Sequence, residues 1–172
     1  NDLIVVKYIE PEETHRATLG RNLAQDPERL EVAERARLSG HVALSSGIEL
    51  RDALGRTQPG FVMMFPVYRR GSSPTNEAAR KASIEGWVFA RFITENLMNG
   101  VLADRGLDLH FVVFDDTSAA TAHELVYDDD PVMTAQRSPE ASWFSASQIL
   151  RFGGRTWTLG YATKPAFRSE EH

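Results

Sequence analysis

Histidines and two acidic turns are the residues of this sequence that could do acid–base or metal chemistry. The histidines are His15, His41, His110, His123 and His172. They lie in separate segments and share no metal-ligand spacing, whereas a metal site needs several ligands brought together. The acidic runs Asp115-Asp116 and Asp128–Asp130 lack the spaced oxygens and the glycine of a calcium loop. Aspartate favours turns because its side chain bonds nearby backbone, so we interpret both runs as turns and predict no metal site.

Motifs of the common enzyme classes are absent from the sequence. It contains no phosphate-binding glycine loop, no Gly-x-Ser-x-Gly and no His-Glu-x-x-His. It contains no cysteine, which excludes disulfides, thiol nucleophiles and cysteine-ligated metals. A free-standing hydrolase that uses Asp and His is the least favoured function, because no nucleophile–base pair can be located. We predict no catalytic residue and no cofactor.

The composition is that of an ordinary folded protein. Of the 172 residues, 42% are hydrophobic and 25% charged, which is enough to build a core. Lys plus Arg is 19 against 24 Asp plus Glu, for a net charge of −5. Because phosphate contacts need clustered basic residues, we expect no nucleic-acid partner. No apolar run approaches the roughly 20 residues that span a bilayer.

The first half predicts a helix followed by antiparallel strands. Asp26-Pro27 is typical of a helix start and Ser39-Gly40 of a helix end, which predicts a helix over Pro27–Leu38. The other expected elements are a buried strand over Leu3–Ile9, short strands near Val42–Ser45 and Ile48–Leu50, a loop over Asp52–Gly60, a central strand over Phe61–Tyr68, a loop over Arg69–Asn76 and a returning strand over Ile84–Phe92. Pro66 cannot donate to a strand ladder, so it marks a bulge or an edge.

The second half repeats this layout. The expected elements are a helix from Thr94 through Leu102 that Gly106 stops, strands over Leu109–Phe114 and Leu125–Tyr127, and strands over Phe144–Phe152 and Trp157–Tyr161 around the turn Gly153-Gly154. The pattern predicts an α+β fold used twice, with the boundary in the helix that begins at Thr94.

The run Phe61–Tyr68 is apolar on both faces of its strand. Phe61, Met63, Phe65 and Val67 share one face, and Val62, Met64 and Pro66 share the other. Such a strand is more often core than pocket, and composition favours core here. One face could instead line a small-molecule pocket, since these are mostly apolar.

Three stretches of the sequence, taken together, resemble the CHASE domain, an extracytoplasmic sensor of membrane histidine kinases and nucleotide cyclases. They are LGRNLAQDPER at residues 19–29 with ARLSG at 36–40 and ALSS at 43–46; GFVMMFPVYR at 60–69; and GWVFARF at 86–92 before a helix with Leu97 and Leu102. The segment Tyr8–Pro11 is similar to the one that follows the family's stalk helix. The order and spacing match over residues 3–105.

The resemblance implies two PAS-like α/β subdomains, each an antiparallel sheet with flanking helices, joined by a helix. Residues 1–93 would be the membrane-distal, ligand-sensing half, and residues 94–172 the connecting helix and membrane-proximal half, and we expect the family's stalk helix to be missing from these residues. The implied function is the small-molecule sensing input domain of a membrane receptor, a sensor histidine kinase or a diguanylate cyclase. The implied location is periplasmic or extracellular, in an inner-membrane protein. We expect a homodimer in the intact receptor, with membrane contact only through flanking transmembrane helices.

The resemblance also implies a ligand site. Its residues here are Arg29, Ala33, Ser45, Leu50, Arg51, Met64 and Gly86. In plant receptors for adenine-type cytokinins an acidic residue, which corresponds to Arg29, holds the purine. The reversed charge disfavours an adenine-type ligand and favours a carboxylate or phosphate, which a guanidinium binds through several donors. Alternatively, Arg29 is a helix residue paired with a neighbouring acid.

A second interpretation is a dimerisation or protein-interaction module whose pocket is filled by its own side chains. The bulky residues that favour it are Met63, Met64, Phe65, Trp87 and Phe89. It predicts no bound small molecule.

Overall fold

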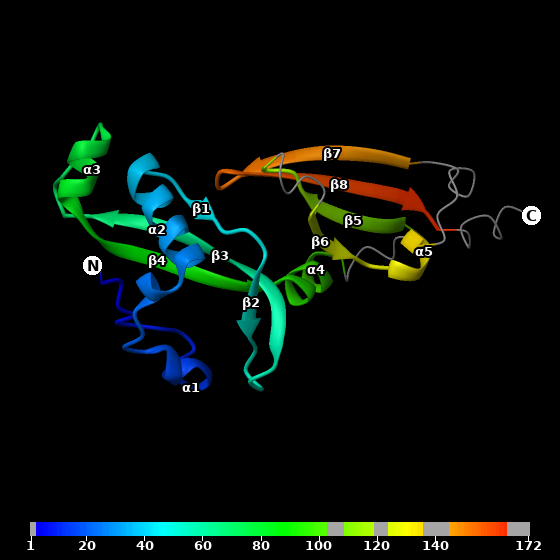
Figure 1. The fold of residues 1–172 in the computed structure, drawn as a ribbon, viewed down its shortest axis with the longest axis horizontal. Coiled ribbons are helices and arrows are strands. Elements are labelled where there is room, and N and C mark those ends of the chain that lie inside the picture. Colours follow the sequence, from blue (N-terminus) through cyan, green and yellow to red (C-terminus); the bar gives the residue numbers. More distant parts are fainter. Residues whose placement is uncertain (1–2, 103–108, 119–123, 136–144, 165–172) are drawn as a thin grey trace, which may run out of the picture. The chain divides into compact units, whose positions relative to one another are not determined.

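The computed structural model describes residues 3–102, 109–118, 124–135 and 145–164. Contacts divide the chain into two compact units, Asn1–Ile93 and Thr94–His172. Each unit contains one antiparallel sheet with helices (Figure 1). This arrangement confirms the prediction of an α+β fold made of two PAS-like α/β subdomains.

The first unit contains a four-stranded sheet built around β3. Its elements are α1 (Glu12–His15), two short 3-10 turns (Arg16–Thr18 and Leu23–Gln25), α2 (Pro27–Ser39), β1 (Ala43–Leu44), β2 (Ile48–Arg51), β3 (Thr57–Tyr68), α3 (Glu77–Ser83) and β4 (Ile84–Ile93). Strands β1 and β2 both pair antiparallel with β3, and β4 pairs with β3 along almost its whole length.

The second unit contains a four-stranded sheet in the order β6-β5-β8-β7. Its elements are α4 (Thr94–Leu102), β5 (Leu109–Asp115), β6 (Glu124–Asp128), α5 (Pro131–Ala135), β7 (Ser145–Phe152) and β8 (Arg155–Thr163). Gly153 and Gly154 have φ of 58° and 75° in the tight turn between β7 and β8, which confirms the predicted hairpin.

Helix α2 begins and ends where the sequence predicts, within one residue. The Asp26 carboxylate accepts hydrogen bonds from the backbone N–H groups of Glu28 and Arg29, at 3.1 and 3.2 Å. Gly40 ends the helix with a φ of 75°. The buried stripe Val32, Ala33 and Ala36 faces the sheet, and the Trp87 indole N–H donates to the carbonyl of Ala33 at 2.9 Å.

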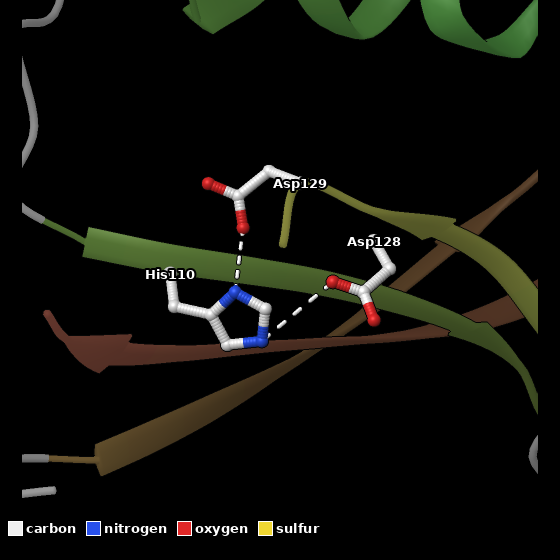
Figure 2. Close-up of side chains that lie close together, drawn as sticks. All are labelled: His110, Asp128 and Asp129. Atoms are coloured by element: carbon white, nitrogen blue, oxygen red, sulfur yellow. Dashed lines mark hydrogen bonds and ion pairs between the residues drawn. The ribbon is translucent and has the colours of Figure 1, made fainter. Parts of the chain in front are cut away.

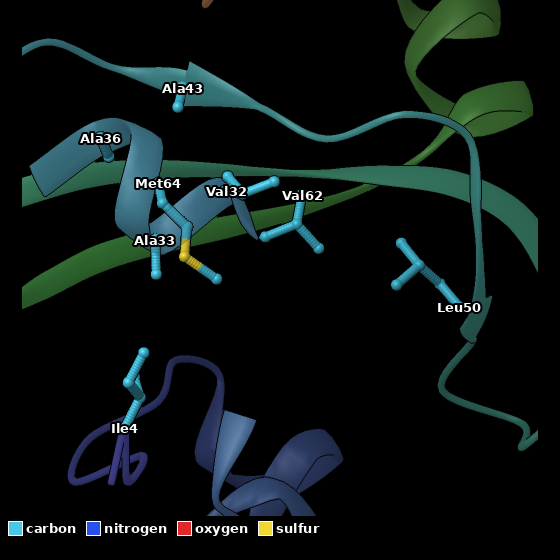
Figure 3. Close-up of a cluster of buried hydrophobic side chains, with 8 residues drawn as sticks. All are labelled: Ile4, Val32, Ala33, Ala36, Ala43, Leu50, Val62 and Met64. Atoms are coloured by element: carbon cyan, nitrogen blue, oxygen red, sulfur yellow. The ribbon is translucent and has the colours of Figure 1, made fainter. Parts of the chain in front are cut away.

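The core of the first unit lies between α2 and one face of the sheet (Figure 3). Its buried members are Ile4, Val32, Ala33, Ala36, Ala43, Leu50, Val62 and Met64. The opposite face of β3 is only partly covered by the described residues: Phe65 is 53% exposed, and Val88, its partner on β4, is 63% exposed. The run Phe61–Tyr68 therefore buries one face more fully than the other.

The prediction of a buried strand over Leu3–Ile9 is wrong. This segment joins no sheet and makes only an isolated bridge from Val5 to Asn22. Its backbone bonds go to the loop before α2: the Val6 N–H donates to the Arg21 carbonyl at 3.1 Å, and the Leu23 N–H donates to the Ile4 carbonyl at 2.7 Å. Alternate burial of Ile4 and Val6 produced the strand-like pattern without a sheet partner.

The predicted loop over Asp52–Gly60 ends too late, because β3 begins at Thr57 and pairs there with β2. Gly60 is required by close packing and not by a turn. A Cβ at this position would lie 2.3 Å from the Phe92 carbonyl oxygen and 2.6 Å from Leu50 Cδ1. Further along β3, Pro66 lies beyond the β1 pairing, and a register shift follows at Val67, which confirms the expected edge or bulge.

Three short α-helices, α1, α3 and α5, were not predicted. Asn76 caps α3 by accepting from the Ala79 N–H at 2.9 Å. The α3 sequence, EAARKAS, consists of good helix formers with almost no apolar stripe, so hydrophobic periodicity cannot detect it. α5 follows the acidic run directly and is only five residues long.

Candidate functional site

Three predicted ligand residues, Ala33, Leu50 and Met64, lie together in the core of the first unit. Each is 2% exposed or less. They pack in one cluster between α2, β2 and β3 (Figure 3). In this conformation their side chains belong to the buried core next to α2.

Ser45 is also buried, but its hydroxyl is used by the backbone. Its Oγ accepts from the N–H of Val62 at 2.9 Å and donates to the carbonyl of Ser46 at 2.7 Å. The Ser45 N–H in turn donates to the Val62 carbonyl at 2.8 Å. The side chain thus extends the pairing of β1 with β3 by one step.

Gly86 lies on the other face of the sheet from the core residues. It pairs with Val67, in the same alternation as the exposed Phe65, whereas Val62 and Met64 point toward α2. The structure therefore does not bring Gly86 together with Ala33, Leu50 and Met64.

Arg29 projects from the first turn of α2, on the same stripe as Ala33 and Ala36. Its side chain is 20% exposed and forms an ion pair with Asp26, three residues earlier. This ion pair agrees with the alternative interpretation of Arg29, in which it is a helix residue paired with a neighbouring acid. Arg29 still lies on the stripe of α2 that carries Ala33 and Ala36 toward the sheet.

Arg51, at the end of β2, contacts Arg91, a residue that the sequence analysis did not include in the site. The Arg51 side chain is exposed, and its carbonyl accepts from Nη2 of Arg91 on β4 at 3.4 Å. The same Nη2 lies 3.3 Å from Nδ1 of His15. Arg91 pairs with Val62, so it belongs to the α2-facing side of the sheet.

Arg21, Arg29 and Arg91 form what we call the arginine cluster. Burial lowers the pKa of Arg91, and the charges of Arg29 and then Arg21 lower it further. A signal for this site was present in the sequence: Trp87, Phe89 and Arg91 alternate on one strand face, and a charge that continues an apolar face is unusual.

The second unit contains a buried histidine between two carboxylates (Figure 2). His110 on β5 is 1% exposed, and its Nδ1 lies 2.6 Å from Asp129 Oδ1. Its Nε2 lies 2.9 Å from the Thr134 hydroxyl and 3.7 Å from Asp128 Oδ1. The structure thus brings His110 together with two residues of the acidic run that we interpreted only as a turn.

Every group of this histidine cluster has a protein partner. Asp129 also accepts from the Phe111 N–H at 2.8 Å and from Lys164 Nζ at 3.0 Å. Burial opposes ionisation of Asp129, but these bonds and the one to His110 outweigh it and lower its pKa. The Thr134 hydroxyl also donates to Asp128 Oδ2 at 2.6 Å.

His110, Asp128 and Asp129 are of metal-ligating types, and one ligand atom of each lies within 4.8 Å of the others. A metal ion there would have to displace the proton donors that already satisfy both carboxylates. We therefore assign the cluster a structural role, in which it fastens β6 and α5 to β5. No local spacing reveals it, because His110 and Asp129 are 19 positions apart.

The other acidic run also follows its predicted role. The Thr117 N–H donates to the Asp115 carboxylate at 3.0 Å, which is the turn contact expected of aspartate. Asp115 also pairs with Arg155, whose Nε lies 2.9 Å away. Burial opposes its ionisation, but the bonds from Thr117 and Arg155 outweigh burial and lower the pKa of Asp115.

The two α/β units, each with an antiparallel sheet, define the class of two-unit, PAS-like domains. A family model described as the CHASE domain matches residues 1–127, which cover the whole first unit and reach β6 of the second. The chain therefore belongs to the CHASE domain family, whose members are extracytoplasmic, non-catalytic sensory domains of signalling receptors. A search of curated proteins finds no significant match. Among the described residues, no helix has both the length and the apolar character needed to cross a membrane.

Proposed function

We propose that this chain is the small-molecule sensing input domain of a membrane-bound receptor, with a sensor histidine kinase or a diguanylate cyclase as its parent. The observation that carries the proposal is the CHASE match over the whole first unit. In this proposal residues 1–93 bind the ligand, and residues 94–172 form the membrane-proximal half. The domain acts at the periplasmic or extracellular side of the inner membrane, as a homodimer.

The connection between the units supports a mechanical role. Strand β4 ends at Ile93 and α4 begins at Thr94, so no residue separates the strand from the helix. A ligand that moves β4 would therefore move the start of α4 directly. To signal, the ligand must favour one of two arrangements, because equal affinity for both shifts nothing.

The proposed ligand site lies at the edge of the core, between α2 and the face of the sheet that carries Val62. Arg29 and Arg91 are the polar groups at this edge. A polar anchor beside an apolar wall is the usual composition of a small-molecule site. An adenine-type ligand is not favoured, because the position of the expected acid is Arg29.

Native mass spectrometry followed by a thermal-shift screen tests the proposal. The panel contains adenine derivatives, amino acids and organic acids. A ligand present at 100 times the dissociation constant of a single site adds about 2.7 kcal/mol to the free energy of unfolding, which gives a measurable rise in melting temperature. A co-purified mass or a hit supports a sensor. A domain that carries no co-purified molecule and whose melting temperature no compound changes would favour the second candidate function, described below.

The second candidate is an interaction module with a filled pocket. It is favoured by the packing of Ala33, Leu50 and Met64 and by the exposed apolar residues Phe65 and Val88. Sedimentation velocity over a range of concentrations tests it. Concentration-dependent association, together with an empty pocket screen, would support this candidate, and a monomer with a ligand hit would reject it.

A further inference from the structure

We infer that the ligand of this domain carries an oxyanion, a carboxylate or a phosphate, and that Arg91 binds this group together with Arg29 and Arg21. The inference rests on the proposed sensing function and names the chemical class of its ligand. It assigns the main contact to Arg91, which lies on β4 and not on the helix.

The position of Arg91 suits such a contact. On β3, its partner Val62 is 1% exposed, and Trp87, four residues before Arg91 on the same face, donates to the Ala33 carbonyl of α2. Arg29 lies one helical turn before Ala33 on the sheet-facing stripe. The strand and the helix thus both carry an arginine toward the edge of the same core.

Arg91 has donors left for a ligand. Both of its contacts, to the Arg51 carbonyl and to His15, use Nη2 and are long, at 3.4 and 3.3 Å. Within the described parts of the chain, its Nε and Nη1 have no hydrogen-bond partner, and neither belongs to the buried polar atoms that lack one. Nε–H and one Nη–H form the fork that receives a carboxylate or phosphate in bidentate fashion.

The charge of the arginine cluster is not balanced. Asp26 pairs with Arg29, and over the described ranges no carboxylate pairs with Arg21 or Arg91. Three guanidinium groups and one carboxylate leave two positive charges, in a chain whose net charge is −5. Burial and the charges of Arg29 and Arg21 lower the pKa of Arg91, although its guanidinium stays charged. A bound oxyanion would relieve this repulsion.

The test is a titration of the purified chain with inorganic phosphate and with succinate, against sodium chloride at matched ionic strength. Calorimetry gives the affinity and a thermal scan gives the shift. The wild type should bind at least one of the two anions and be stabilised beyond the chloride control. Arg91→Gln should weaken this binding by at least tenfold, which is about 1.4 kcal/mol. Arg70→Gln, which changes an exposed arginine of the same unit, is the matched control and should bind as the wild type does.

Two further variants keep the test decisive. Arg29→Gln should also weaken anion binding, and it replaces Arg91→Gln if that variant does not fold. Arg91→Lys keeps the positive charge but loses the two parallel N–H donors of the guanidinium. If these donors contribute to binding, this variant should bind phosphate more nearly as the wild type does than it binds succinate. Preference for phosphate or for succinate in the wild type distinguishes the two sources of the oxyanion.

The outcomes separate this inference from the proposed function. Equal anion binding by the wild type and the Arg91→Gln and Arg29→Gln variants would overturn the inference. A neutral compound that stabilises wild type and Arg91→Gln equally would leave the sensor standing and refute the anion site. No shift with any anion or compound would count against both.

Discussion

Ser45→Ala tests whether the Ser45 hydroxyl serves the fold or the ligand. The hydroxyl accepts the N–H of Val62 at 2.9 Å, and both residues are 1% exposed. Alanine cannot accept this bond, and the methyl group blocks water from replacing it. A buried N–H without a partner costs about 1–3 kcal/mol, so we expect the free energy of unfolding to fall by that amount.

Urea unfolding followed by circular dichroism measures the global loss, and amide hydrogen exchange measures it at Val62. The Val62 amide should exchange faster in Ser45→Ala, because the hydroxyl that protects it is gone. Ser46→Ala is the matched control, since its carbonyl and not its side chain takes part in the bond from Ser45. A loss below about 0.5 kcal/mol, with unchanged protection of Val62, would refute the reasoning. If the variant also lost a ligand-dependent shift while keeping its stability, Ser45 would be a ligand residue instead.

Three further predictions concern stability. Gly60→Ala should destabilise the first unit by more than about 2 kcal/mol, because the new Cβ would meet the Phe92 carbonyl oxygen at 2.3 Å. The control is Gly100→Ala, where a Cβ has no atom within 4 Å; alanine favours the helix there and should raise the melting temperature slightly. Equal effects of the two substitutions would contradict the close packing described at Gly60. His110→Asn should cost about 1–3 kcal/mol, because Asp129 loses its 2.6 Å partner while Phe111 and Lys164 still donate to it, and chemical denaturation that shows a loss below about 0.5 kcal/mol would reject the structural role of the cluster. Folding lowers the pKa of Asp115 below 3.8, so its contribution to stability is complete above that value and is lost as the pH falls through the lower folded value. The melting temperature of Asp115→Asn should therefore fall less steeply between pH 6 and pH 2 than that of the wild type. An equally steep fall would contradict the role given to Asp115.

Local signals in the sequence were enough to predict the elements that surround the proposed site. Asp26 and Gly40 mark the ends of α2 because a cap and a left-handed residue are local chemistry. The apolar run of β3 and its return in β4 follow from strand patterning. Segment 3–9 was predicted wrongly because alternate burial is the same whether the partner is a sheet or a loop.

The candidate site was only partly predictable. Arg29, Ser45 and Met64 came from a family register, which places residues on elements but cannot say what their side chains touch. Arg91 continues the apolar strand face of Trp87 and Phe89, but its contacts, to Arg51 and His15, join positions 40 and 76 residues apart and could not be predicted from spacing. The partners of His110 were missed for the same reason, since tertiary proximity leaves no spacing pattern.

The segment before α1 has a mechanical consequence. Its backbone bonds to residues 20–23 flank the isolated antiparallel bridge from Val5 to Asn22, and the chain between the two segments connects them at one end. Tension that pulls Ile4 away from Leu23 would break these hydrogen bonds one after another and not all at once, so a low force would suffice to detach the segment. Ile4 would then leave the core, and the loop that holds Arg21 would lose its anchor. A pull on this end of the domain would thus loosen the arginine cluster without touching the sheet.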